Sequence, residues 1–125
     1  MTARIFAAAW AAVVACALVG CGGSSHRDHQ TSGAVGPGLT IEVTIANGQV
    51  NPTNATLQAR VKEQITLKIT SDVTDELHVH SVPDHKFEIA AAPNQTFQFS
   101  VDVPGNVDVE LHHLKRTIAT IQIQP

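Results

Sequence analysis

The strongest constraint on the fold is a period-two alternation of apolar and polar residues that begins at Leu39. In the first run Leu39, Ile41, Val43 and Ile45 alternate with Thr40, Glu42 and Thr44. Side chains of an extended strand point alternately to its two faces, so this pattern indicates a strand with one buried face. Similar runs recur at residues 57–61, 65–69, 77–82, 87–89, 97–101, 107–111 and 119–123.

Turn-forming residues separate these runs. Asn47-Gly48, Asn51-Pro52, Pro83-Asp84 and Pro104-Gly105 are the clearest examples, and such pairs are typical of turns between strands. Seven or eight short strands at this spacing, without an amphipathic helix, predict a single all-β domain, either a sandwich or a barrel. Alternation with one polar face favours antiparallel sheets that are packed on one side only.

The first twenty residues have a different character. Arg4 precedes an apolar run over residues 5–19, which is the layout of a secretory signal peptide and is short for a membrane span. The run ends in Leu-Val-Gly-Cys at residues 18–21, which resembles the bacterial lipoprotein signal. The resemblance implies that Cys21 becomes the N-terminus and carries diacylglycerol and palmitate-type acyl chains. Two or more such chains anchor stably, so we expect a chain held at the extracytoplasmic face of the cell membrane. The alternative is an ordinary signal peptide that leaves Cys21 as a free thiol.

The segment that follows has the composition of a linker. Residues 22–38 are rich in glycine, serine and other polar residues, and too few apolar groups are present to offset the entropy of folding. We therefore divide the chain into a lipoprotein signal peptide (1–20), a flexible tether (21–38) and one folded domain (39–125). Cys16 and Cys21 are the two cysteines. The first leaves with the signal peptide and the second carries lipid, so we expect no disulfide.

Composition and motifs exclude several classes of function. The formal net charge is −3, and the chain has no basic run, so nucleic acid is not an expected partner. No Gly-x-Ser-x-Gly elbow and no His-Glu-x-x-His motif occurs, and we expect no enzymatic activity. The chain has seven histidines, a large share for its length, and all of them follow the signal peptide.

The second half of the domain resembles a cupredoxin, most clearly at the Pro104-Gly105 turn and the strand after it. In that family one strand carries a first histidine ligand of copper. A later loop, at the end of the strand after the Pro-Gly turn, supplies cysteine, histidine and usually methionine. The resemblance implies a Greek-key β-sandwich over residues 39–125. The histidines at comparable positions are His78, His80, His112 and His113.

The chain departs from this family in its sulfur ligands. A type 1 copper site requires a thiolate, and the family cysteine would fall at about Leu111, whereas the domain contains no cysteine. Met1 is the single methionine, so the axial ligand is also missing. The chain is therefore not expected to be a blue-copper electron carrier, and only the fold and the histidine positions carry over.

The histidines of the domain are candidate ligands for a metal without sulfur. His78 and His80 are two residues apart on one strand, so they share a face at a backbone distance of roughly 6–7 Å. Nitrogen ligation without thiolate favours Cu(II), followed by Zn(II). Carboxylates of Asp84, Glu88 or Glu110 could add an oxygen ligand or accept a ring N–H. The complete candidate set is His78, His80, His85, His112 and His113.

Three functions remain open at this point, and the third is a domain that has lost an ancestral electron-transfer site and serves only structure. The first is a metal-handling lipoprotein that binds copper or another divalent ion through these histidines. The second is an interaction module that docks another cell-envelope protein, with solvated histidines that have no ligand, because the fold does not choose between these roles. A pH-sensing role is compatible with the first, since protons and metal ions compete for the same lone pairs. His26 and His29 in the tether form at most a weak chelate.

Overall fold

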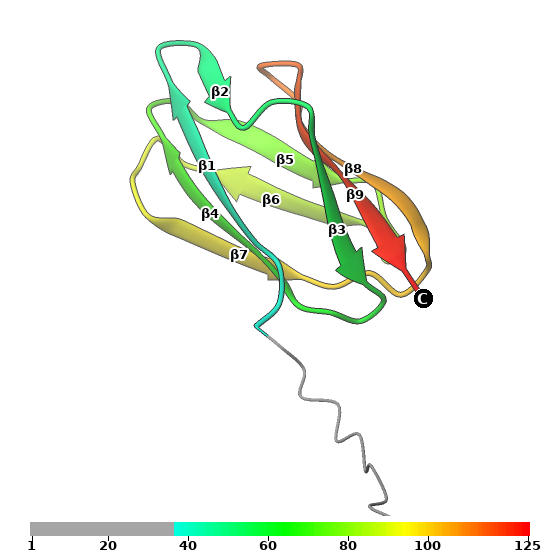
Figure 1. Cartoon of the computed structure of the whole chain (residues 1–125). Helices are drawn as coiled ribbons and strands as arrows, with labels where there is room; N and C mark the ends of the chain where they lie inside the picture. The colour runs from blue at the N-terminus through cyan, green and yellow to red at the C-terminus, as the bar shows by residue number, and fades with distance from the viewer. Residues whose placement is uncertain (1–36) are drawn as a thin grey trace, which may run out of the picture. The chain divides into compact units, whose positions relative to one another are not determined.

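The computed structural model describes residues 37–125, which form an all-β domain of nine strands in two sheets (Figure 1). The signal peptide, Cys21 and the tether up to residue 36 lie outside the described residues. Within residues 37–125 no helix is long and apolar enough to cross a membrane. The strands are β1 (Thr40–Ala46), β2 (Gln49–Asn51), β3 (Ala55–Arg60), β4 (Ile65–Ser71), β5 (Asp75–Val79), β6 (His85–Ile89), β7 (Gln95–Phe99), β8 (Gly105–Leu111) and β9 (Arg116–Gln124).

The two sheets pack face to face as a sandwich. The first has the strand order β2-β1-β4-β7 and the second the order β3-β9-β8-β5-β6. Neighbouring strands are antiparallel, as the alternation predicted, except for the parallel pairs β1–β4 and β3–β9. These parallel pairs arise because the chain passes to the other sheet between the two partners. The predicted Greek-key sandwich is confirmed.

The ninth strand is β2, a three-residue segment that the alternation pattern did not predict. It pairs with β1 through the hairpin turn at Asn47 and Gly48, whose φ angles of 53° and 72° lie in the left-handed region. Two successive positive φ angles are typical of the type I′ turn, whose twist matches that of the two strands it joins. Val82, which was expected at the end of an alternating run, lies beyond the end of β5 and is 60% exposed.

The core fills the space between the sheets with the inward-facing residues of the predicted runs. Each fully buried aliphatic side chain contributes about 1.5–3 kcal/mol relative to an exposed one. Among residues 37–125, the buried hydrophobic residues lie between Ile41 and Ile123 and form one cluster. The side chains with no exposed surface include Ile65, Leu67, Ile69, Leu77, Val79, Val109, Ile118 and Ile121.

Candidate functional site

Strands β5 and β8 lie side by side in the second sheet and place the histidines. Leu77 and Val79 are fully buried, so His78 points to the outer face, as the alternation predicted. In the register, His78 lies opposite Glu110 of β8 on one side and Lys86 of β6 on the other. Just past the end of β8, the backbone N–H of His112 donates to the carbonyl oxygen of Glu76 at 2.9 Å. The outer face of β5 is thereby brought next to the first residue of the β8–β9 turn.

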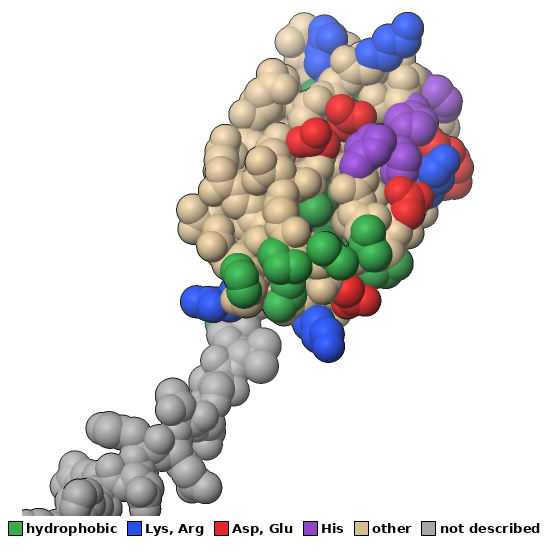
Figure 2. Space-filling view, turned by 90° about the vertical axis from the view of Figure 1, so that its right-hand side faces the viewer, with side chains coloured by type: hydrophobic (Ala, Val, Ile, Leu, Met, Phe, Trp, Pro, Cys, Tyr) green, Lys and Arg blue, Asp and Glu red, His purple; other side chains and the backbone are tan. Residues whose placement is uncertain are grey.

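Three of the five candidate histidines meet on this outer face. The ring centroids of His78 and His80 are 4.0 Å apart, and those of His78 and His112 are 5.2 Å apart in an edge-to-face arrangement. The Nε2 atom of His112 lies 3.3 Å from Nδ1 of His78. Figure 2 shows histidine side chains gathered on one face, with acidic side chains around them. We call His78, His80 and His112 the histidine cluster.

Each ring of the histidine cluster is bonded to a carboxylate through one nitrogen. Nε2 of His78 lies 2.6 Å from Oδ1 of Asp84, and Nδ1 of His112 lies 2.9 Å from Oε1 of Glu76. Nε2 of His80 lies 2.9 Å from Oε2 of Glu110. An ionised carboxylate only accepts hydrogen bonds, so each of these ring nitrogens must carry a proton and donate.

These hydrogen bonds indicate which ring nitrogens of His78 and His112 carry a proton. A neutral imidazole has one N–H and one lone pair, and the N–H of both His78 and His112 is directed to a carboxylate. The lone pairs of His78 Nδ1 and His112 Nε2 then face each other across 3.3 Å. Such a contact is favourable only when a proton or a metal ion lies between the two atoms.

Two of these carboxylates, those of Asp84 and Glu76, also lie near positively charged groups. The hydrogen bond from His78 is the main cause that lowers the pKa of Asp84 below its ordinary value, with a contribution from the charge of Lys86, although desolvation acts in the opposite direction. Glu76 also lies 3.7 Å from the ammonium group of Lys86.

The other two candidate histidines lie apart from the cluster. His85 is paired with the buried Val79 and therefore points to the inner face, where it packs beside Phe87 and Phe99 and bonds through Nε2 to the carbonyl oxygen of Ser100 at 3.0 Å. The side chain of His113 is 69% exposed, and its Nδ1 atom lies 3.8 Å from Asp75. The structure does not bring either ring to the facing nitrogens.

Asp75 and Glu76 are site residues that the sequence analysis did not single out. The carboxylate of Asp75 is fully buried and accepts the backbone N–H groups of His113 at 2.8 Å and Leu114 at 3.0 Å. It thereby holds the β8–β9 turn against β5. The sequence did indicate their positions. Residues two apart on a strand share a face, so Asp75 is expected to point inward like Leu77, and Glu76 is expected to point outward like His78.

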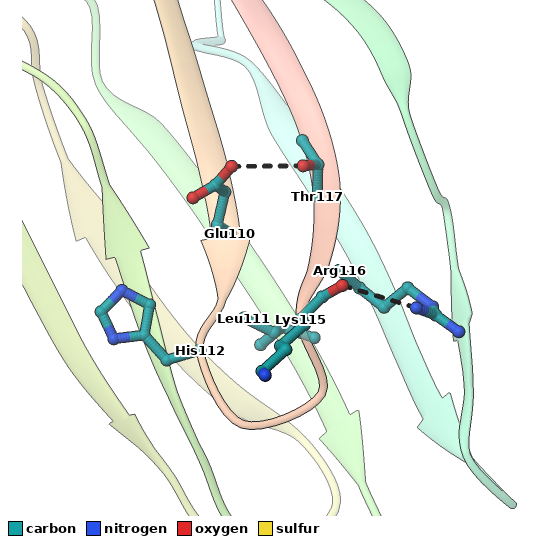
Figure 3. Close-up of a pocket in the computed structure, with 6 residues that line it drawn as sticks. All are labelled: Glu110, Leu111, His112, Lys115, Arg116 and Thr117. Atoms are coloured by element: carbon teal, nitrogen blue, oxygen red, sulfur yellow. Dashed lines mark hydrogen bonds between the residues drawn. The ribbon is translucent and has the colours of Figure 1, made fainter.

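A hollow of about 270 Å³ opens beside His112, next to the β8–β9 turn (Figure 3). Glu110 lies on its wall, where Oε1 accepts a hydrogen bond from the hydroxyl of Thr117 at 3.3 Å. Lys115 and Arg116 also line it. His112 is the one member of the histidine cluster that lines this hollow.

A type 1 copper centre does not fit these residues. The position expected for its cysteine is Leu111, which is 1% exposed and part of the core. Residues 37–125 contain neither cysteine nor methionine. In this part of the chain no group of three or more histidine, cysteine, aspartate or glutamate side chains is arranged to hold a metal ion.

Comparison with solved structures decides the architecture. A reduced auracyanin from the photosynthetic bacterium Roseiflexus castenholzii superposes with a TM-score of 0.52 at 9% identity, over 72% of this chain and 100% of that one. The domain has a cupredoxin-like fold. Auracyanin B gives the same TM-score at 12% identity, over 71% of this chain and 91% of its own.

Other similarities are weaker. A Cu(I) form of an amicyanin mutant matches at a TM-score of 0.47 and 14% identity, over 68% of this chain and 82% of that one. No protein-family model matches the chain, and a search of curated proteins finds no relative. The likeness of this cupredoxin-like domain to the auracyanins concerns its fold.

Proposed function

We propose that this chain is an exported lipoprotein that is anchored through Cys21 and binds one divalent metal ion through Nδ1 of His78 and Nε2 of His112. Cu(II) is the preferred ion and Zn(II) the next, in line with nitrogen ligands and the general order of affinities. The role is metal handling in the cell envelope, without catalysis and without blue-copper electron transfer. The observation that carries the proposal is the 3.3 Å separation of these two ring nitrogens, each on a ring whose other nitrogen is bonded to a carboxylate.

The distance between the two nitrogens supports this proposal. Two nitrogens that bind one ion at about 2.0–2.1 Å are about 2.9–3.4 Å apart in square-planar or tetrahedral geometry. The measured separation of 3.3 Å lies in this range. Asp84 and Glu76 then act as the carboxylates that orient metal-binding imidazoles and raise their basicity.

Two protein nitrogens leave further coordination positions open. Water or a ligand donated by another molecule then fills these positions. An ion held in this way exchanges more readily than one in a closed four-ligand site, which suits a protein that receives and passes on metal. Protons compete for the same lone pairs, so binding weakens as the pH falls.

The test is a titration of the fragment 37–125 with Cu(II) and with Zn(II) by isothermal calorimetry. This fragment contains the buried core cluster and lacks His26, His29 and Cys21, which removes competing ligands. We expect one Cu(II) per chain, retained through dialysis, with a weak d–d absorption and no intense blue band. H112A is expected to weaken binding by at least about tenfold, and D84N by about tenfold through the lost orientation of His78.

His113 supplies the matched control, because it is adjacent to His112 in the same turn and its ring does not face His78. H113A should change the affinity less than twofold. If the parent fragment binds no metal, or if H112A binds as tightly as the parent, the metal site is refuted. A cell-envelope partner recovered by crosslinking would then favour the interaction module.

The anchor is tested separately in cells. We expect the wild-type chain in the membrane fraction, with an N-terminal peptide whose mass includes diacylglycerol on Cys21. C21A should move the chain to the soluble extracytoplasmic fraction. Recovery of unmodified Cys21 from the mature protein would refute the anchor, and it would leave the metal site untouched.

A further inference from the structure

The chain enters the domain along a path that is held tightly at one end of the sandwich. The backbone N–H of Leu39 donates to Oε1 of Glu63 at 3.0 Å, and its carbonyl oxygen accepts the N–H of Thr66 at 2.8 Å. A Cβ atom on Gly38 would lie 1.9 Å from the carbonyl oxygen of Gln64. Only glycine allows this approach, so the entry point is fixed next to the β3–β4 loop.

Backbone hydrogen bonds connect this loop to two further loops at the same end. The N–H of Lys62 donates to the carbonyl oxygen of Val101, and the N–H of Asp102 donates to that of Val82, both at 2.8 Å. The β5–β6 loop and the β7–β8 loop therefore lie beside the entry point, and Figure 1 shows the described chain beginning at this end. We call residues 37–39, 61–64, 80–84 and 100–104 together the entry end.

The entry end carries most of the exposed large hydrophobic surface of the described domain. Val82 is 60% exposed and Val103 is 48% exposed, and both line a shallow hollow together with Pro104. Figure 2 shows a group of hydrophobic side chains at this end. The third large exposed hydrophobic residue, Val73, is 37% exposed. It lies between β4 and β5, at the far end.

We propose that the entry end is a membrane-contact surface, with Val82 and Val103 at the headgroup boundary of the bilayer that holds the lipid of Cys21. This inference rests on the proposed lipid anchor. Residues 22–38 connect Cys21 to the entry end, and a glycine- and serine-rich chain of this length has an end-to-end distance of about 20–25 Å. The entry end is consequently the part of the domain nearest the bilayer.

The surrounding charges limit the depth of this contact. Asp84 and Asp102 are exposed next to the two valines, and a charged group is costly in hydrocarbon. The contact is therefore shallow, and the short lipid tether rather than the valines supplies most of the attachment. His80 lines the same hollow as the two valines, and Asp84 is bonded to His78 at 2.6 Å, so the histidine cluster begins directly beside this contact surface.

Single tryptophans provide the test, because Trp10 is the one tryptophan of the chain and is absent from residues 21–125. The chain 21–125 is coupled through the Cys21 thiol to a maleimide phospholipid in vesicles of phosphatidylethanolamine and phosphatidylglycerol. V82W, V103W and the matched far-end control V73W are compared by quenching with brominated lipids. We expect at least twofold stronger quenching for V82W and V103W than for V73W, together with a blue shift of their emission.

Equal quenching of the three variants would overturn the inference. So would a blue shift of V82W that is already complete without vesicles and depends on protein concentration, since this would identify a second copy of the chain as the occupant. Circular dichroism shows that each variant is folded. Chemical coupling replaces natural acylation, so the outcome is separate from the test of the anchor by the mass of Cys21.

Discussion

The buried carboxylate of Asp75 should make a large contribution to the stability of the domain. It accepts one local hydrogen bond from the N–H of Glu76 at 2.7 Å and two from residues 38 and 39 positions away in the sequence, the N–H groups of His113 and Leu114. A hydrogen bond to a charged group contributes about 1.5–3 kcal/mol. The two long-range bonds give about 3–6 kcal/mol, and the removed desolvation cost of the carboxylate lowers this sum. We expect D75A to reduce the free energy of unfolding by about 2–4 kcal/mol.

The assay is urea unfolding of the fragment 37–125, followed by far-ultraviolet circular dichroism because the fragment has no tryptophan or tyrosine. D72A is the control, since Asp72 accepts a single exposed backbone bond from Asn47 at 2.7 Å. Its expected effect is about 0.5–1.5 kcal/mol. Equal effects of D72A and D75A, or a loss below about 1 kcal/mol in D75A, would refute the reasoning that the buried carboxylate holds the β8–β9 turn.

Two further predictions concern the entry point and the histidine cluster. G38A forces a methyl group against the carbonyl oxygen of Gln64 and should destabilise the fragment by about 1–3 kcal/mol; a melting temperature equal to or above that of the parent would contradict this. The pKa of Asp84, followed by carboxyl carbon NMR, should lie below the ordinary aspartate value and rise toward it in H78N, because His78 is the main cause of the shift. A lowered folded-state pKa stabilises the fold above the unfolded pKa, and this contribution is lost as the pH falls through the folded value. An unchanged Asp84 titration in H78N would exclude the hydrogen bond as its cause.

The faces of the strands could be predicted from the sequence because they depend on local geometry alone. Successive side chains of a strand alternate, so the runs around Leu77 and Val109 placed His78 and His112 outward without knowledge of the partners. The strand β2 escaped prediction because three residues are too few to show a period. In β9, the adjacent Ile118 and Ala119 are both buried, near the register shift between Val109 and Glu110 of β8. Such an irregularity depends on the partner strand and leaves no clear local pattern.

The sequence by itself determined the all-β class, the lack of sulfur ligands in the domain and the presence of candidate nitrogen ligands. Only the tertiary structure decided which of these nitrogens meet. His78 and His112 are 34 residues apart in the chain, and their distance depends on the pairing of β5 with β8 and on the turn that Asp75 holds. His85, seven residues from His78, lies on the opposite face. Register between distant strands is set by the packing of the whole core, which no local period of the sequence encodes.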